Sequence, residues 1–268
     1  MTAHDPAASI EDELLIATTG AVRLLSMNRP RTRNGLTIPL TERLLTALGE
    51  CAADGAVRAV VLTGEGGAFS SGLDFRSAME QAGTDLAPHL ERNFHGMVRA
   101  IRGLPKPVIA LVDGAAAGFG CDLALACDVR LGTARTRFGE IFIKRGLMPD
   151  GGGTFHLPRL VGLGNAMHLL LSGDMVGPEE ALRLGLVTRL LPDDSAVSDT
   201  LEYAARLAAG PPRVHAWIKR AVYGALDGSL EDALAVEKGG QLELLRSADF
   251  LEGVAAFLEK REPSFRGE

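Results

Sequence analysis

The chain has 268 residues, with 28 Lys and Arg against 34 Asp and Glu and a formal net charge of −6. This acidic balance argues against a general nucleic-acid-binding protein, which usually carries a basic excess. No apolar run approaches the length of a membrane-spanning helix, and a chain of this size can bury a substantial core without disulfides.

The cysteines and histidines show no metal-ligand pattern. Cys51, Cys121 and Cys127 form no CxxC pair, and the six histidines lack the spacing of a zinc site. We therefore expect reduced, packed thiols and a cytoplasmic protein without a metal site. Residues 1–12 are polar and acidic, with no basic segment leading into an apolar one. We expect an N-terminal extension there and no signal peptide.

The chain opens with a predicted hairpin. Residues 14–17 and 22–26 are the two candidate strands, and they flank a turn at 18–21. Thr37 is a good N-cap residue, and leucines at helical spacing follow it. A helix is therefore predicted directly after Thr37.

Three short apolar runs predict buried strands at 59–63, 108–112 and 129–131. Glycine clusters follow the first two runs, and a helical pattern follows the second. This recurrence of strand, glycine-rich turn and helix implies an α/β fold with functional loops at the ends of the strands.

The last quarter of the chain changes to a helical pattern. The polar stretch 193–199 is the candidate boundary, and helices are predicted from Ser195 onward. Asp249 and the residues after it predict a capping box before the final helix. The apolar faces of these helices could seal the core or form a contact between subunits.

Two glycine segments suggest a binding site made of backbone amides. Residues 68–75 and 113–124 each follow a predicted buried strand. Two such turns, brought together, could aim N–H groups at one point, which is the arrangement of an oxyanion hole. A single glycine-rich turn is more often only a tight turn. No P-loop, GxSxG or HExxH motif occurs, and GxGxxG is incomplete.

Several ordered segments resemble the enoyl-CoA hydratase/isomerase (crotonase) family. The segment 69–74 is similar to its FxxGxD motif, and 114–128 to its NGxAxGxGxxLALACD motif. Residues 138–157 and 257–265 resemble its GLxPxxGGT stretch and its C-terminal signature. The resemblance implies an α/β spiral of repeated ββα units over residues 13–194, then a C-terminal helical region over 195–268. It also implies a homotrimer or a dimer of trimers.

By this resemblance, the backbone amides of Leu73 and Phe119 form the oxyanion hole. They follow Gly72 and Gly118, which set the two turns. Only the N–H groups act, so the side chains are free to vary. Phe119 stands where glycine is frequent in the family, and we expect it to narrow the acyl pocket.

The carboxylates decide which reaction the resemblance implies. Asp122 takes the place of the first hydratase glutamate, one methylene shorter, whereas Phe142 stands at the second. Glu140 lies two residues away and cannot be assumed to substitute. Asp150 matches the single carboxylate of the family's 3-enoyl to 2-enoyl isomerases. Hydration needs two acid/base groups and double-bond transfer needs one, so Asp150 and Asp122 are both catalytic candidates.

The resemblance further implies that the substrate is carried as a coenzyme A thioester, with no prosthetic group. Basic side chains suit the CoA phosphates. The candidates for contacts with CoA are Arg31, Arg33, Ser70, Ser71, Gly72, Asp74, Gly118 and Lys260.

Three functions stay open at this point. The first is 3-enoyl to 2-enoyl-CoA isomerisation, which Phe142 and Asp150 favour, and the second is hydration of 2-enoyl-CoA. The third is a non-catalytic binding module with the same fold. Asp122 could also be a helix cap, Asp150 a turn residue, and each basic candidate solvated surface charge.

Overall fold

The predicted hairpin and the helix after it are both present. The computed structural model describes residues 13–82 and 85–268, so the predicted extension 1–12 lies outside the described residues. Strand β1 (Leu14–Thr19) pairs antiparallel with β2 (Val22–Met27). The hydroxyl of Thr37 caps α2 (Ile38–Ala53) by accepting a hydrogen bond from the amide of Leu40 at 3.2 Å.

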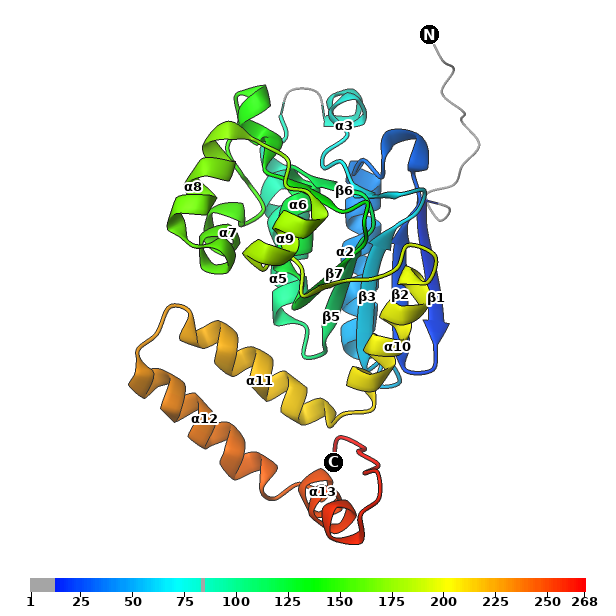
Figure 1. Ribbon diagram of the computed structural model, residues 1–268, viewed down its shortest axis with the longest axis vertical. Helices are drawn as coiled ribbons and strands as arrows, with labels where there is room; N and C mark the ends of the chain where they lie inside the picture. The colour runs from blue at the N-terminus through cyan, green and yellow to red at the C-terminus, as the bar shows by residue number, and fades with distance from the viewer. Residues whose placement is uncertain (1–12, 83–84) are drawn as a thin grey trace.

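Two sheets form the centre of the molecule (Figure 1). The larger sheet has the order β1-β2-β3-β5-β7-β9, and it is parallel from β2 onward. The smaller sheet, β4-β6-β8, is parallel throughout. The further strands are β3 (Ala59–Gly64), β4 (Ala68–Ser70), β5 (Val108–Val112), β6 (Ala115–Ala117), β7 (Val129–Gly132), β8 (Arg137–Gly139) and β9 (Arg189–Leu190).

The chain alternates between the two sheets, which confirms the predicted spiral of ββα units. Strands β3, β5 and β7 lie in the large sheet, and each is followed by a short strand of the small sheet and then by helical segments. Besides α2, the described helical segments up to residue 184 are η1 (Pro30–Thr32), α3 (Phe75–Ala82), α4 (Ala87–His89), the π-helix η2 (Leu90–His95), α5 (Gly96–Gly103), α6 (Phe119–Ala126), η3 (Ile141–Arg145), α7 (Gly153–Val161), α8 (Leu163–Ser172) and α9 (Pro178–Leu184).

The large sheet is covered on both faces, which explains why its strands are continuous apolar runs. Val60, Leu62 and Val108 belong to the core on the side of α2, α5 and α6. Val61 and Ile109 point to the other face. There they pack against the buried alanines of α10 (Ala196–Ala208).

The remaining helices, α11 (Pro212–Ala225), α12 (Leu230–Leu244) and α13 (Ala248–Glu259), project below the sheets (Figure 1). The helical region predicted over 195–268 thus has two parts. Helix α10 packs on the large sheet, whereas α11, α12 and α13 extend away from the sheet. The division into domains stays a prediction. Within residues 13–82 and 85–268, no helix is both long and apolar enough to cross a membrane.

The capping box predicted at Asp249 is wrong. Ser247 caps α13, and its hydroxyl accepts a hydrogen bond from the amide of Phe250 at 3.1 Å. The carboxylate of Asp249 instead accepts hydrogen bonds from the amides of Arg266 and Gly267 at 2.6 and 2.8 Å. Asp249 thus fixes the C-terminal tail, a contact that the local sequence does not encode.

Candidate active site

The two glycine turns that follow β4 and β6 are in direct backbone contact. These strands are neighbours in the small sheet, so their ends lie side by side. Gly72 has φ +83°, and a Cβ atom there would lie 2.7 Å from the carbonyl oxygen of Ala117 and 3.1 Å from the nitrogen of Phe119. Only glycine allows the two turns to approach so closely.

The amides of Leu73 and Phe119 are free to bind a ligand. Neither N–H group donates to another residue in the described part of the chain. Phe119 is the first residue of α6, where the N–H has no partner within the helix. The amide of Leu36 donates to Gly72 at 2.8 Å, which fixes the turn beside Leu73. Two unpaired amides that face the same point can stabilise a developing oxyanion.

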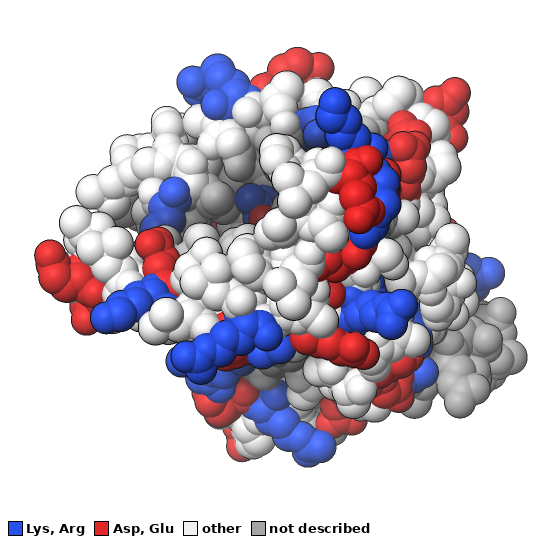
Figure 2. Space-filling view, turned by 90° about the horizontal axis from the view of Figure 1, so that it is seen from below, with Lys and Arg blue, Asp and Glu red and all other residues white. Residues whose placement is uncertain are grey.

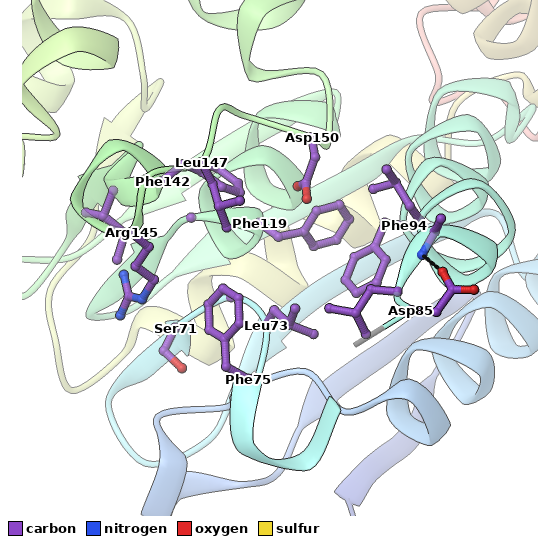
Figure 3. Close-up of a pocket in the computed structure, with 16 residues that line it drawn as sticks. Ser71, Leu73, Phe75, Asp85, Phe94, Phe119, Phe142, Arg145, Leu147 and Asp150 are labelled. Atoms are coloured by element: carbon purple, nitrogen blue, oxygen red, sulfur yellow. Dashed lines mark hydrogen bonds between the residues drawn. The ribbon is translucent and has the colours of Figure 1, made fainter. Parts of the chain in front are cut away.

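Both residues line a cavity of about 390 Å³ (Figure 3). The rings of Phe94 and Phe119 meet edge to face inside it, with centroids 4.7 Å apart. Ser71, Asp85, Arg145 and Asp150 supply its polar side chains. The rest of the lining is apolar or glycine: Gly72, Leu73, Phe75, Leu86, Ala87, Leu90, Phe94, Gly118, Phe119, Ile141, Phe142 and Leu147.

Asp150 carries its carboxyl group into this cavity. In Figure 3 the carboxyl points from the loop before α7 toward the ring of Phe119. Its Oδ1 atom is buried and accepts no hydrogen bond from the described residues. Burial raises the pKa of Asp150, and the nearby charge of His95 opposes that shift. A carboxyl in this setting suits proton transfer.

Asp122 lies behind the cavity and is not part of its lining. It is fully buried, and its Oδ2 atom accepts a hydrogen bond from the amide of Gly151 at 2.8 Å. The ring of Phe119 lies close to the same loop, since a Cβ atom on Gly151 would be 2.6 Å from that ring. Asp122 therefore contacts the loop that carries Asp150.

At the second hydratase position, Phe142 lines the cavity with a buried ring. Glu140 is buried and lies outside the lining, so it does not place a carboxylate in the cavity. It lies beside Asp122, a relation that sequence reasoning missed. No signal in the sequence shows this, because the segments after Ala117 and Gly139 meet only through the pairing of β6 with β8.

The polar CoA candidates near Gly72 are engaged within the protein. The hydroxyl of Ser70 donates to the carbonyl of Asn34 at 2.8 Å and accepts from the amide of Gly72 at 3.2 Å. Ser71 donates to the carbonyl of Thr32 at 2.9 Å while it lines the cavity. Asp74 pairs with Arg29 at 3.0 Å. These side chains fix the turn.

The basic candidates lie at opposite ends of β3. Arg31 and Arg33 are exposed and close to the end of β3, since the side chain of Asn34 donates to the carbonyl of Glu65 at 2.9 Å. Lys260 directly follows α13, in the C-terminal segment whose Phe265 accepts a hydrogen bond from Arg58, just before β3. Within one chain, Lys260 therefore does not lie beside Arg31 and Arg33.

This geometry agrees with comparisons to known proteins. Residues 17–268 match the model of the enoyl-CoA hydratase/isomerase family. The chain belongs to this family. It is therefore an enoyl-CoA hydratase/isomerase enzyme, acting on CoA thioesters, with the crotonase fold.

Three relatives illustrate the range of the enoyl-CoA hydratase/isomerase family around this chain. A probable enoyl-CoA hydratase of Rhodobacter capsulatus is 42% identical over 91% of this chain and 94% of its own. The 1,2-epoxyphenylacetyl-CoA isomerase of Escherichia coli is 38% identical over 92% and 95%. The crystal structure of a putative enoyl-CoA hydratase of Streptomyces coelicolor A3(2) has a TM-score of 0.91 at 38% identity, covering 99% of this chain and 98% of its own.

Proposed function

We propose that this enzyme moves a double bond of an enoyl-CoA thioester from the 3- to the 2-position. The observation that carries the proposal is the placement of Asp150 in one cavity with the free amides of Leu73 and Phe119, while Phe142 stands at the second hydratase position. A phenyl ring cannot activate water, and it keeps the site dry. A base and an oxyanion hole suffice for double-bond transfer.

In the proposed reaction the thioester oxygen accepts hydrogen bonds from the amides of Leu73 and Phe119. The ionised carboxyl of Asp150 removes a proton from the carbon between the carbonyl and the double bond. The electron pair forms a dienolate, whose oxygen charge each amide stabilises by about 3 kcal/mol. Asp150 then returns the proton to the distal carbon, so the double bond moves into conjugation and no atom is gained or lost.

Hydration of 2-enoyl-CoA is the second candidate. It is favoured by the Rhodobacter capsulatus relative, which is named a probable enoyl-CoA hydratase. The Escherichia coli relative named as an isomerase supports the first candidate. Against hydration, Asp122 is fully buried behind the cavity and could reach water at the double bond only if the loop moved.

The test is to incubate the protein separately with matched short-chain 3-enoyl-CoA and 2-enoyl-CoA and to identify the products. Isomerisation predicts rapid conversion of the first to the second and little 3-hydroxyacyl-CoA from either. A variant of the exposed Asp194, Asp194→Asn, is the control for removal of a carboxylate elsewhere. Ready formation of 3-hydroxyacyl-CoA from 2-enoyl-CoA, without isomerisation of 3-enoyl-CoA, would make the hydratase the better description.

We also propose that the enzyme assembles as a trimer or a dimer of trimers. Seen from below, where α11–α13 lie, the surface shows broad uncharged stretches between clusters of charge (Figure 2). Since Lys260 and the pair Arg31 and Arg33 lie at opposite ends of β3, we propose that the lysine contacts the CoA phosphates of a neighbouring chain. The exposed apolar side chains of α12 and α13 include Leu230, Leu234, Leu242, Phe250, Leu251, Val254, Phe257 and Leu258.

We also propose that the protein is located in the cytoplasm. It is supported by Cys51, Cys121 and Cys127, which are buried free thiols. Unpaired cysteines are the rule where glutathione keeps thiols reduced.

A further inference from the structure

Two carboxyl groups are buried together behind the cavity. Asp122 and Glu140 are 0% and 2% exposed, and neither has an ion-pair partner in the described part of the chain. Three of their four oxygens, Oδ1 of Asp122 and both oxygens of Glu140, accept no hydrogen bond from a described residue. The fourth, Oδ2 of Asp122, accepts from the amide of Gly151.

Two of the three unpaired oxygens face the same point. A methyl group placed on Gly153 would overlap Oδ1 of Asp122 and lie 2.9 Å from Oε1 of Glu140. A buried carboxylate without donors is very unfavourable, and two adjacent carboxylates cannot both ionise. A proton on one carboxyl removes both problems, because it turns two repelling acceptors into a donor and an acceptor.

The surroundings favour a single negative charge on the pair. Asp122 lies in the first turn of α6, and Gly153 is the first residue of α7. The N-terminal ends of helices stabilise an anion. Among the described residues, the other titratable groups that act on the pair are the thiol of Cys121 and the carboxyl of Asp150, and neither supplies a positive charge.

The pKa of each carboxyl is raised, as expected for two buried carboxyls that share a proton. Burial, followed by the charge of Glu140, raises the pKa of Asp122 well above its usual value. Burial raises the pKa of Glu140 to about 7. The folded pair therefore holds one proton between Asp122 and Glu140.

We infer that Asp122 is a positioning residue that bridges Glu140 to the loop of Asp150 through a proton shared by the two carboxyls. The shared proton joins Oδ1 of Asp122 to Glu140, while Oδ2 of Asp122 accepts from Gly151, the residue after Asp150. The bridge fixes the loop and so holds the carboxyl of Asp150 in the cavity. The part of this inference that concerns turnover rests on the proposed isomerisation.

Asp122 needs different chemistry as a proton-transferring residue than as a bridge between Glu140 and Gly151. A residue that shuttles a proton must be able to ionise, whereas a protonated bridge needs only one donor and one acceptor. An asparagine supplies both, through its NH₂ group to Glu140 and its oxygen to Gly151. Leucine supplies neither, although its side chain has the same branching and the same number of heavy atoms as that of asparagine.

The first measurement is turnover of 3-enoyl-CoA by Asp122→Asn and Asp122→Leu. The asparagine variant should stay within about threefold of the unmodified enzyme. The leucine variant should lose about tenfold or more, because small misplacement of a reacting group can cost up to about 10²-fold. Its affinity for a saturated acyl-CoA should change little, since Asp122 does not line the cavity. Loss of turnover in Asp122→Asn would overturn the inference.

The second measurement needs no substrate. The folded pair keeps a proton that the unfolded chain loses above about pH 4, so stability falls as the pH rises. Asp122→Asn needs no such proton, because its NH₂ group donates to an ionised Glu140. The melting temperature of Asp122→Asn minus that of the unmodified protein should therefore increase between pH 5 and 8. A flat difference would mean that the folded pair holds no proton, and it would overturn the inference whatever the reaction is.

If Asp122→Asn does not fold, Glu140→Gln gives the same test. The NH₂ group of glutamine can donate to Oδ1 of Asp122, so the remaining carboxylate needs no proton. The unmodified protein keeps the shared proton when folded and loses stability as the pH rises above the unfolded pKa values. The melting temperature of Glu140→Gln relative to the unmodified protein should therefore rise between pH 5 and 7. A difference that does not change over this range would contradict the shared proton.

Discussion

At the scale of single residues, Gly72 and Gly20 show two different reasons for a glycine. At Gly20 the reason is the positive backbone φ alone, whereas at Gly72 a second segment of backbone also lies too close for a side chain. Both have positive φ, +83° and +57°, but a Cβ atom on Gly20 would meet nothing within 4 Å. A Cβ atom on Gly72 would press against Ala117 and Phe119, and Gly72 precedes a proposed oxyanion amide.

We expect Gly72→Ala to lower turnover of 3-enoyl-CoA by about 10²-fold, which is the loss expected for one oxyanion donor. Gly20→Ala should leave turnover unchanged and lower the free energy of unfolding by about 1 to 2 kcal/mol, the cost of a left-handed residue with a side chain. Steady-state kinetics and thermal unfolding distinguish the two. Equal turnover in both variants would argue against the placement of the oxyanion hole.

The pH dependence of turnover should report on Asp150. Asp150 must be ionised to remove a proton, and burial raises its pKa, so turnover should fall as the pH drops through that raised value. The charge of His95 lowers the pKa of Asp150. Replacement of this residue, His95→Gln, should therefore move the acidic limb of the pH profile to higher pH. The exposed His168 offers the control His168→Gln, which should leave the limb in place.

At the scale of elements, a buried ion pair connects α11 to the segment between α6 and β7. The ammonium of Lys219 pairs with the carboxylate of Asp128 at 2.7 Å, and the side chains are 11% and 14% exposed. Asp128 also accepts from the hydroxyl of Tyr223 and from the amide of Val108, which begins β5.

Replacement of this lysine, Lys219→Met, should lower the free energy of unfolding by about 3 to 5 kcal/mol, because it leaves a buried carboxylate without its cation. The control is Arg183→Met. Its ion pair with Glu180 is 65% and 48% exposed, so its loss should cost at most about 1 kcal/mol. Chemical denaturation of both variants checks the difference. Similar losses would mean that the Lys219 pair does not stabilise the position of α11.

The elements that could be predicted from the sequence are those that local chemistry determines. The hairpin around Gly20, the helix capped by Thr37 and the strand at 59–63 each carry their own turn, cap or apolar run. The three-residue strands β4, β6 and β8 could not be predicted, because they depend on pairing with each other in space. The same holds for Asp249, whose partners come from the C-terminal tail.

In the candidate site, motif resemblance identified the glycine turns and the two aspartates by position. It could not say which aspartate lies in the cavity. In the structure Asp150 lines the cavity, whereas Asp122 is buried behind it. Glu140 was set aside for its position in the sequence, and only the pairing of β6 with β8 brings it beside Asp122.

At the scale of the whole molecule, the proposed assembly depends on the exposed face of α13. Leu251 and Leu258 are 66% and 73% exposed and lie two helical turns apart, on one face of the helix. The double variant Leu251→Glu with Leu258→Glu should dissociate the assembly, since burial of both charges in an interface is unfavourable. Light scattering coupled to size exclusion measures the mass.

The same double variant should weaken binding of CoA, because separated chains cannot bring Lys260 to Arg31 and Arg33. Val197→Glu is the control, since Val197 is a 49% exposed apolar residue on α10. It should keep both the mass and the affinity. A monomeric unmodified protein, or a dissociated variant with full affinity for CoA, would refute the proposed role of the neighbouring chain.

The proposed function depends on Asp150 as the acid/base group, and the most direct measurement is isomerisation of 3-enoyl-CoA by Asp150→Asn. Asparagine keeps the shape of the side chain and cannot carry a proton between two carbons. We predict that isomerisation falls by about 10² to 10⁴-fold, the usual contribution of general acid/base catalysis, while affinity for a saturated acyl-CoA is nearly unchanged. If Asp150→Asn still isomerises 3-enoyl-CoA, while Asp122→Asn is inactive and the unmodified enzyme readily hydrates 2-enoyl-CoA, the account is contradicted.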